Sequence, residues 1–291
     1  MAGSLWVDAS EPPSPFHLQA LAEYLSNLAL QGAIRSASFA APWRWRGRVL
    51  GFYQSSDKPE HTYRRMTGGP EAVYGEEGTY VFLVHPSTGL GETLDKAIEA
   101  AWCILEACGA GYRGFRDGRL IHGGGVGALG VTRLATRGAG PGVVEIHLPG
   151  LRCENAAKRC LSPILGQAEE EKPEWSGLDR IASSYSEPGW RAYPGTRGLA
   201  VGESRRGGYY VKVGVAMESG VIAAARLEGS FYAAPPAEPF STLAALEGMP
   251  PTAANIDIVL SRLSTRAELA GVYLDDFKRA LQEALEASGW D

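Results

Sequence analysis

The chain has 291 residues, of which 45% are hydrophobic and 21% are charged, and its formal net charge is -5. A single hydrophobic core usually stops growing near about 250–300 residues, so we expect two domains. The acidic balance argues against nucleic acid as a partner, because nucleic-acid binders normally display a clustered basic surface. No stretch approaches about 18 uninterrupted apolar residues, and no basic segment precedes an apolar run near residue 1. We therefore expect a soluble, cytoplasmic protein with no membrane partner.

Hydrophobic periodicity predicts a mixture of helices and strands in the first part of the chain. The predicted elements are helices at 16–31, 91–109 and 153–166, and strands at 48–54, 79–86 and 143–150. Between two of them lies "GRLIHGGGVGALGVTRLATRGAGPG", whose glycines predict either a hairpin with closely approached backbone or a flexible loop. The segment "GQAEEEKPEW" is expected to be a polar connector.

A change of composition near residue 185 marks the expected domain boundary. The segment "SYSEPGWRAYPGTRG" is rich in Gly, Pro and Ser, which is typical of linkers, so the predicted domains are 1–184 and 185–291. Beyond it, two strands around a turn at Ser219 and Gly220 predict a hairpin. Helices are expected at about 238–247, 252–263 and 273–287. The second domain should be a small α+β module without a catalytic constellation.

The four cysteines lie in two helical stretches, and we predict that all four are buried free thiols. They are Cys103, Cys108, Cys153 and Cys160. A long chain without an export signal is not expected to use a disulfide framework. Within one helix the two pairs would be separated by roughly 7.5 and 10.5 Å, beyond the Cα separation of about 7 Å that a disulfide tolerates. No His/Cys cluster suggests zinc, so no metal site is predicted.

The segment "RRMTGGPEAVYGEEGTYVF", residues 64–82, combines two arginines with a pair of glycines. Adjacent glycines allow backbone N–H groups to approach a ligand, and arginines bind phosphate or carboxylate oxygens in a forked geometry. This combination suits a nucleotide or an acyl-adenylate. The plainer alternative is that Gly68 and Gly69 build a turn and that Arg64 and Arg65 form a solvated edge.

Three segments together resemble the lipoate-protein ligase A family of the biotin/lipoate ligase superfamily. The family motif reads RRxSGGGAVxHD, followed by a glycine and a strand, and this chain has Pro70-Glu71 where one glycine is expected. The matching residues are Arg64, Arg65, Thr67, Gly68, Gly69, Ala72, Val73, Tyr74 and Gly78. "WRGRVLGFYQ" at 45–54 is similar to the preceding strand, and "DGRLIHGGGVG" at 117–127 to the family's DGRKIxGxA segment. The segment after residue 206 resembles the accessory module of these ligases.

The resemblance implies a central mixed sheet flanked by helices, as in biotin/lipoate ligases and class II synthetase-like folds, followed by a small α+β domain. It implies a protein that uses ATP, Mg²⁺ and lipoate to form lipoyl-adenylate, and that joins the lipoyl group to a carrier-domain lysine. The expected partner is a lipoyl carrier domain of a 2-oxoacid dehydrogenase or a glycine-cleavage H-type protein. The implied cofactor-binding residues are Arg65, Thr67, Gly68, Gly69, Ala72, Val73, Tyr74 and Gly123.

At one position the chain departs from the family in a way that bears on catalysis. Leu120 stands where the family has the lysine that holds the acyl carbonyl and the phosphate. Because residues alternate in direction along a strand, Leu120 is expected to point into the acyl-adenylate pocket, with its two neighbours pointing away. Removing one electrostatic contact of this kind typically costs about 10²- to 10³-fold in rate. The family's histidine and aspartate are replaced by Gly75 and Glu76.

The catalytic residue therefore stays unknown at the level of sequence. Arg119 or Lys158 are candidates to supply the missing charge, whereas His122 is more typical of a structural or solvated histidine. Cys108, twelve residues before Leu120, is a candidate nucleophile. Three hypotheses follow: an ATP-dependent lipoate ligase, an ATP-independent octanoyl or lipoyl transferase that uses Cys108, and a non-catalytic paralogue that acts as a binding module.

Overall fold

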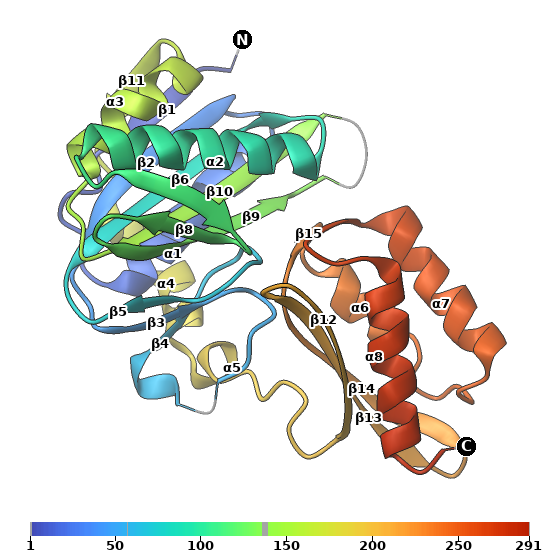
Figure 1. Ribbon diagram of the computed structural model, residues 1–291. Helices are drawn as coiled ribbons and strands as arrows, with labels where there is room; N and C mark the ends of the chain where they lie inside the picture. Colours follow the sequence, from blue (N-terminus) through green and yellow to red (C-terminus); the bar gives the residue numbers. More distant parts are fainter. Residues whose placement is uncertain (1, 57, 136–138, 291) are drawn as a thin grey trace.

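A computed structural model describes residues 2–56, 58–135 and 139–290 (Figure 1). Its centre is an eight-stranded mixed sheet in the order β11-β1-β2-β6-β10-β9-β8-β7. β1 pairs in parallel with β2 and β11, and the other neighbours are antiparallel. The strands are β1 (Ser4–Val7), β2 (Ser36–Trp43), β6 (Gly78–Ser87), β7 (Tyr112–Arg116), β8 (Arg119–His122), β9 (Gly125–Arg133), β10 (Gly140–Pro149) and β11 (Ala168–Glu171).

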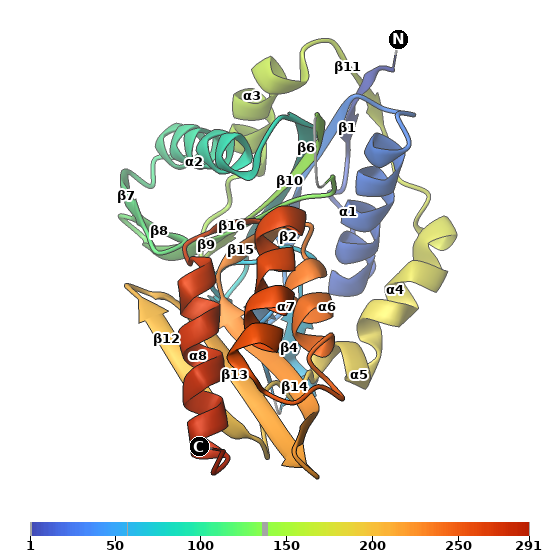
Figure 2. The ribbon, with the colours of Figure 1, turned by 90° about the vertical axis from the view of Figure 1, so that its right-hand side faces the viewer.

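Helices cover both faces of this sheet, as Figure 2 shows for α1 and α2. They are α1 (Pro15–Leu30), α2 (Leu90–Ala107), α3 (Glu154–Leu165), α4 (Asp179–Ser186) and α5 (Pro188–Arg191), with 3-10 turns at Pro59–His61 and Trp175–Leu178. Apolar residues at helical spacing on α2 and α3 close one core with the sheet, and those on α1 close a second core on the opposite face. The predicted helices at 16–31, 91–109 and 153–166 are confirmed.

A small second sheet, in the order β4-β3-β5, lies beside the large one. It contains part of the segment 64–82, which we call the arginine-glycine motif. Its strands are β3 (Gly47–Leu50), β4 (Thr62–Arg64) and β5 (Ala72–Tyr74). The predicted strand at 48–54 therefore ends at Leu50. Gln54 ends it, because its backbone N–H donates to the Gly51 carbonyl at 3.1 Å and its side-chain oxygen accepts from the Gly51 N–H at 2.8 Å. These two bonds fold residues 51–54 into a turn.

The C-terminal region has its own three-stranded sheet, covered by helices. The strands of this sheet are β12 (Ala200–Arg206), β13 (Tyr209–Glu218) and β14 (Val221–Ser230), and β15 (Tyr232–Ala234) pairs separately with β16 (Glu268–Ala270). The helices of the region are α6 (Glu238–Ala244), α7 (Ala253–Arg266) and α8 (Leu274–Ala287). The predicted hairpin is confirmed, and its turn residues Ser219 and Gly220 both have positive φ, at 50° and 81°. The three predicted helices are present. The predicted boundary near residue 185 falls within α4, which packs on α1, and stays a prediction.

One segment differs from its prediction in a way that local sequence does not reveal. Residues 168–171 were expected to belong to a polar connector, but they form β11, which pairs in parallel with β1 at the edge of the large sheet. An edge strand obtains its hydrogen bonds from one neighbour and leaves its side chains in solvent, so the three glutamates are tolerated there.

Among the residues described, no helix is both long and apolar enough to cross a membrane.

The prediction of four free thiols is wrong, because two disulfides join α2 to α3. Cys103 is bonded to Cys160, and Cys108 to Cys153, with Cα separations of 5.9 and 5.5 Å. The prediction considered distances along single helices, whereas the antiparallel packing of α2 against α3 brings one cysteine from each helix together. The chain between the bonded cysteines spans 57 and 45 residues.

Reduction of these disulfides is expected to lower the free energy of unfolding by about 2–4 kcal/mol, because cross-links across long loops restrict the unfolded chain. Urea unfolding, followed by circular dichroism with and without a thiol reductant, measures this loss. The matched control replaces all four cysteines by serine, and reductant should leave the stability of that variant unchanged. Equal stability of the wild-type protein in both conditions would show that the disulfides do not constrain the fold.

Buried histidines make the fold sensitive to acid. Burial lowers the pKa of His85, His122 and His147, most strongly for His147, whose Nδ1 lies 3.1 Å from the Tyr74 hydroxyl. Unfolded histidine takes up a proton near pH 6.5, whereas these folded histidines do so only at lower pH. Below about pH 6.5 the unfolded chain therefore binds more protons, and stability is lost as the pH falls toward the folded pKa values.

We expect the free energy of unfolding to fall between pH 6.5 and pH 5, by up to about 1.4 kcal/mol per pH unit for each histidine that behaves in this way. Denaturant unfolding at a series of pH values measures the slope. His147→Gln should make the slope shallower, whereas His61→Gln, at an exposed position, should not. A slope that is the same in all three proteins would rule out His147 as a source of the acid sensitivity.

Candidate functional site

The arginine-glycine motif forms a loop on the face of the large sheet that α1 covers, and Arg65 is buried at its centre. The Arg65 side chain is 0% exposed. Its Nη2 donates to the carbonyls of Gly68 and Pro70 at 2.9 and 2.7 Å, and its Nε donates to the Thr67 hydroxyl at 3.1 Å. Arg65 therefore holds together the loop between β4 and β5, residues 65–71, which we call the motif loop.

A buried carboxylate balances this arginine. Glu145 on β10 accepts hydrogen bonds from the Thr67 N–H and hydroxyl and, at 2.7 Å, from the Tyr80 hydroxyl. Burial raises the pKa of Glu145, and the nearby positive charge of Arg65 and these hydrogen bonds oppose the rise. Gly130 makes the arrangement possible, since a Cβ there would lie 2.5 Å from the Arg65 Nε and 2.1 Å from the Thr67 oxygen.

Arg64 is buried as well, so the alternative of a solvated arginine edge is wrong. Its Nε donates to the Trp190 carbonyl at 2.8 Å, and its Nη1 donates to the Phe52 carbonyl at 2.9 Å. Burial lowers the pKa of Arg64 to about 10, so the guanidinium stays charged at neutral pH. Both arginines of the motif therefore hold backbone segments in place.

The glycine pair packs directly against the C-terminal region. The Gly69 N–H donates to the Phe231 carbonyl at 2.8 Å, and the Tyr232 hydroxyl donates to the Leu129 carbonyl at 3.0 Å. A Cβ on Gly68 would lie 2.2 Å from the Phe231 oxygen, and Gly69 has φ +97°. Glycine is thus required at both positions by backbone contact and conformation.

The other predicted adenylate residues lie on β5, where the side chains alternate in direction. Ala72 and Tyr74 are buried, and Val73 between them is 58% exposed. The Tyr74 ring stacks on Trp43 with ring centroids 5.2 Å apart, and its hydroxyl donates to the Thr79 carbonyl at 3.2 Å. Ala72 and Tyr74 thus belong to the second core, and Val73 faces solvent.

The side chains of residues 119–121 alternate in direction as predicted. The residue that borders an open space, however, is Arg119 and not Leu120. Leu120 is 0% exposed and belongs to the core beneath α2 and α3, with Leu129 and Leu148. Arg119 is exposed and lies beside Pro70 and Glu71. Of the two candidates to replace the family lysine, the structure places Arg119 next to the motif.

Gly123 lies at the end of β8 away from the motif, whereas Gly118 lies at the near end. The Gly123 N–H donates to the Ala110 carbonyl at 2.7 Å. A Cβ on Gly118 would lie 2.4 Å from the Pro70 ring and 2.7 Å from the Tyr232 hydroxyl. Gly118 is therefore the glycine of this segment that contacts the motif loop.

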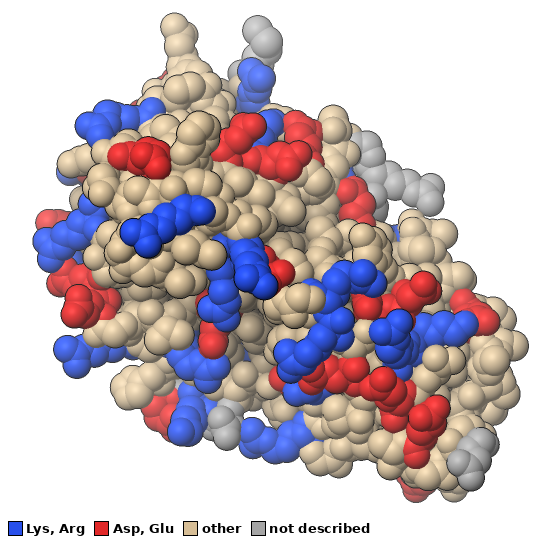
Figure 3. Space-filling view, viewed as in Figure 1, with Lys and Arg blue, Asp and Glu red and all other residues tan. Residues whose placement is uncertain are grey.

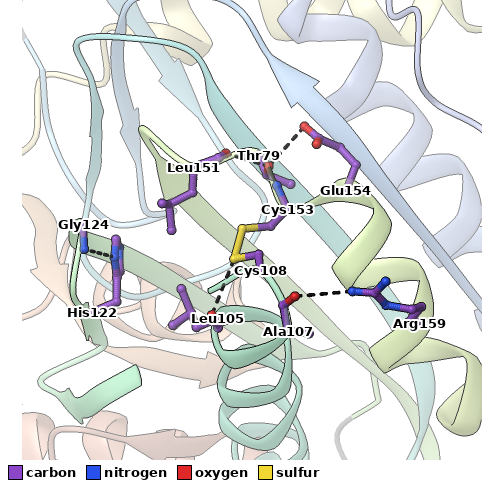
Figure 4. The surroundings of a disulfide bond; sticks show 10 residues. All are labelled: Thr79, Leu105, Ala107, Cys108, His122, Gly124, Leu151, Cys153, Glu154 and Arg159. Carbon is purple, nitrogen blue, oxygen red and sulfur yellow. Dashed lines mark hydrogen bonds between the residues drawn. A yellow bond between two sulfur atoms is a disulfide. The ribbon is translucent and has the colours of Figure 1, made fainter. Parts of the chain in front are cut away.

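The remaining catalytic candidates lie elsewhere in the fold. Cys108 is bonded to Cys153, as Figure 4 shows, so it has no free thiol in this structure. His122 in the same view is buried, and its Nδ1 accepts the Gly124 N–H at 3.2 Å, which is a structural role. Lys158 on α3 forms an ion pair with Glu170 at 2.6 Å and lines a different hollow together with Trp6.

A hollow of about 300 Å³ opens beside the motif loop, where the C-terminal hairpin meets β3 and β8. Its charged and hydroxyl-bearing walls include Arg48, Glu71, Arg119, Arg205, Glu228 and Ser230. Sequence reasoning weighed Arg119 but missed the others. Of these, only Arg205 lies in a segment with a recognisable signal, "RRGGYY" at 205–210, which pairs exposed arginines with tyrosines around two glycines.

The charges in this hollow favour an anion. The Arg48 Nε donates to Glu71 at 2.7 Å, Arg205 pairs with Glu203, and Lys212 lies 3.6 Å from Glu228. The Arg119 side chain, in contrast, has neither a hydrogen bond nor an ion pair within the described part of the chain. Its positive charge is therefore the one left without a counter-ion in this hollow.

Ser230 provides a second unsatisfied group in the same hollow. The residue is 3% exposed, and its hydroxyl has no hydrogen-bond partner among the described residues. An unpaired buried hydroxyl is costly, so this group needs a hydrogen-bond partner that the described residues do not supply. Burial also raises the pKa of the neighbouring Tyr210 to about 12, so its phenol remains a neutral donor. No group of three or more His, Cys, Asp or Glu side chains that could hold a metal occurs among the residues described.

No protein-family model matches the chain, and no curated protein matches it in sequence. The crystal structure of P. falciparum LipL1 in complex with lipoate matches with a TM-score of 0.64 at 11% identity, and the match covers 99% of each chain. Lipoate-protein ligase A bound with ATP matches with a TM-score of 0.49 at 14% identity, over 66% of this chain and 99% of that one. A bipartite lipoate protein ligase from Thermoplasma acidophilum matches with a TM-score of 0.48 at 13% identity, over 66% of this chain and 97% of that one.

At 11% identity the likeness to LipL1 is one of fold. The match with LipL1 extends over the whole length of both chains, including the C-terminal region. The protein therefore has the mixed α+β fold of P. falciparum LipL1, with a large central mixed sheet flanked by helices and a separate C-terminal region of sheet and helices.

Proposed function

We propose that this chain is a lipoate-protein-ligase-like protein that binds lipoyl-adenylate and passes the lipoyl group to a lysine of a carrier domain. The observation that carries the proposal is the pair of unsatisfied groups, Arg119 and the Ser230 hydroxyl, in a hollow walled by the motif loop. The shared fold with LipL1, whose structure contains lipoate, is consistent with it. The carrier would be a lipoyl domain of a 2-oxoacid dehydrogenase or an H-type protein.

In this proposal the hollow receives the phosphate and sugar end of the adenylate. Its volume of about 300 Å³ lies at the lower end of the range of ligand pockets. The Arg119 guanidinium would bind the phosphate in a forked geometry, and the Ser230 and Tyr210 hydroxyls would donate to phosphate or ribose oxygens. The neutral amine of the carrier lysine then attacks the acyl carbonyl, and an amide bond forms as the bond between the acyl carbon and the phosphate oxygen breaks. The amine gives up a proton to solvent, and AMP leaves with its charge stabilised by Arg119.

Formation of lipoyl-adenylate from ATP is the step that this chain is least equipped to perform. Leu120 cannot donate a hydrogen bond or stabilise developing charge, and it is enclosed in the core. Arginine also differs from lysine in geometry, so Arg119 is not an equivalent replacement. ATP would bring Mg²⁺ on its own phosphates, since the carboxylates of the hollow, Glu71 and Glu228, are already paired with cations. We expect little pyrophosphate release from ATP and lipoate.

The transferase that uses Cys108 is the second candidate, and it requires reduction of the Cys108–Cys153 disulfide. A disulfide sulfur has no thiolate with which to attack an acyl group. Transfer that appears only with reductant and is lost in Cys108→Ser would favour this route. The third candidate, a binding module, keeps ligand affinity without turnover.

The test supplies synthetic lipoyl-adenylate and an unlipoylated lipoyl domain, and follows the lipoylated domain by mass spectrometry. We expect the wild-type protein to raise the rate above that without protein, and Arg119→Ala to lower this gain by about 10²-fold, since one charge-stabilising group is lost. Arg46→Ala, at an exposed position outside the hollow, is the matched control and should behave as wild type. Equal rates with and without the protein would contradict the transfer function.

A further inference from the structure

Two hairpin tips meet at the mouth of the hollow. The tip of the β7–β8 hairpin is Arg116–Arg119, and the tip of the β12–β13 hairpin includes Gly207 and Gly208. A Cβ on Gly208 would lie 2.6 Å from the Asp117 Cβ, so the two tips are in direct contact. Segments about 90 residues apart in sequence thereby form one surface.

Exposed arginines are concentrated on these two hairpins. We use the term arginine junction for Arg113, Arg116, Arg119, Arg205 and Arg206, all of which are exposed. Figure 3 shows basic side chains gathered where the N-terminal part borders the C-terminal region. In a chain whose net charge is -5, such a basic surface must be balanced by an acidic surplus elsewhere.

The arginine junction keeps positive charge available to a partner. Arg116 lies 3.5 Å from Asp117, and Arg206 lies 3.3 Å from Asp276. The side chains of Arg113 and Arg119 have neither an ion pair nor a hydrogen bond within the ranges the structure describes. Arg113 is therefore free to bind an external carboxylate, whereas Arg119 is assigned to the ligand in the hollow.

Stacking on tyrosines orients two of the guanidinium groups before any partner arrives. Arg205 lies over the Tyr210 ring at 5.2 Å, and Arg206 lies over the Tyr273 ring at 4.4 Å. Stacked arginines lose less conformational entropy when they bind than free side chains do, and their planar forks match carboxylate geometry. The surface is thus suited to acidic side chains on a folded partner.

We propose that the arginine junction is the docking surface for an acidic face of the carrier protein, which would bring the acceptor lysine to the hollow. This inference rests on the proposed function, because the carrier lysine must reach a ligand held by Arg119. A protein surface is favoured over a nucleic acid because the basic area is confined to two hairpin tips and the whole chain is acidic.

The test uses Arg113→Glu combined with Arg116→Glu, since neither residue lines the hollow. The probe is an unlipoylated lipoyl domain, with a second version in which its surface Asp and Glu are replaced by Asn and Gln. The matched control is Arg262→Glu combined with Arg266→Glu, at exposed positions on α7, far from the β7–β8 hairpin in Figure 1. Calorimetry with the lipoyl domain, and separately with a lipoyl-adenylate analogue, gives both dissociation constants.

We expect the Arg113 and Arg116 reversal to raise the Kd for the lipoyl domain at least about tenfold, and higher salt to weaken wild-type binding. The neutralised domain should bind poorly to every version, and the α7 control should bind as wild type. The analogue should bind the reversal variant with unchanged Kd. Unchanged domain binding by that variant overturns the inference. The inference is also overturned if the wild-type protein binds a thymidine 20-mer and the reversal variant loses that binding while it still binds the domain. A wild-type protein that binds the domain but not the analogue would refute the proposed function and leave the docking surface standing.

Discussion

Leu120→Lys is expected to lower the free energy of unfolding by about 4–7 kcal/mol, because a fully buried lysine loses roughly 3–5 pKa units at about 1.4 kcal/mol each. Leu120 is 0% exposed in the core that α2 and α3 close. A loss of this size approaches the whole stability of an ordinary domain. The substitution that places a lysine where the resemblance expects one should therefore unfold the protein and give no ATP-pyrophosphate exchange.

Denaturant unfolding measures the loss, and Leu120→Met is the matched control, since a swap that nearly conserves volume should cost less than about 1.5 kcal/mol. A Leu120→Lys protein with wild-type stability would show that the side chain at this position reaches solvent or ligand. If that variant also gained pyrophosphate exchange, position 120 would belong to the active site.

Arg65→Ala is expected to cost about 3–5 kcal/mol, because it leaves Glu145 as a buried charge without its counter-charge. It also removes the donors to the Gly68 and Pro70 carbonyls and so releases the loop. Loss of ligand binding in this variant would follow from unfolding and would not report a contact with phosphate. Thermal unfolding followed by circular dichroism measures the effect.

Gly130→Ala tests the same packing from the other side, because its methyl group would fall 2.5 Å from the Arg65 Nε. The two variants should be destabilised in the same sense, whereas Arg46→Ala, at an exposed position, should stay within about 0.5 kcal/mol of wild type. A stable Arg65→Ala protein that has lost only ligand affinity would instead support a direct role of Arg65 at the phosphate.

Elements whose signal is local could be predicted from the sequence. The apolar spacing on α1, α2 and α8 required burial of one helix face, and Ser219-Gly220 accepts the positive φ that a tight hairpin needs. β11 escaped prediction because its glutamates carry no apolar alternation, and its pairing partner lies more than 160 residues earlier. The disulfides escaped for a similar reason, since each joins cysteines on two helices whose packing is set by the sheet beneath them.

In the candidate site, too, the features with a local sequence signal could be predicted and those that depend on distant segments could not. The motif residues were recognised, but Arg65 reads the same in sequence whether it faces a phosphate or a buried glutamate. The distinction comes from Gly130 and Glu145, on strands far along the chain. The hollow is assembled from β3, β8 and the C-terminal hairpin, and no short motif contains Arg119 together with Ser230. Of the charged and hydroxyl-bearing groups that wall the hollow, only Arg119 was a candidate from the sequence.

The central claim is that the hollow bordered by Arg119 and Ser230 holds an acyl-adenylate. The most direct measurement is calorimetric titration of wild type, Arg119→Ala and Ser230→Ala with a non-hydrolysable lipoyl-adenylate analogue. We predict binding by the wild-type protein, a Kd raised about tenfold or more by Arg119→Ala, and a smaller increase for Ser230→Ala, because a charged donor contributes more than a neutral hydroxyl. Wild-type binding that both substitutions leave unchanged, or no binding at all, would contradict the assignment of this hollow.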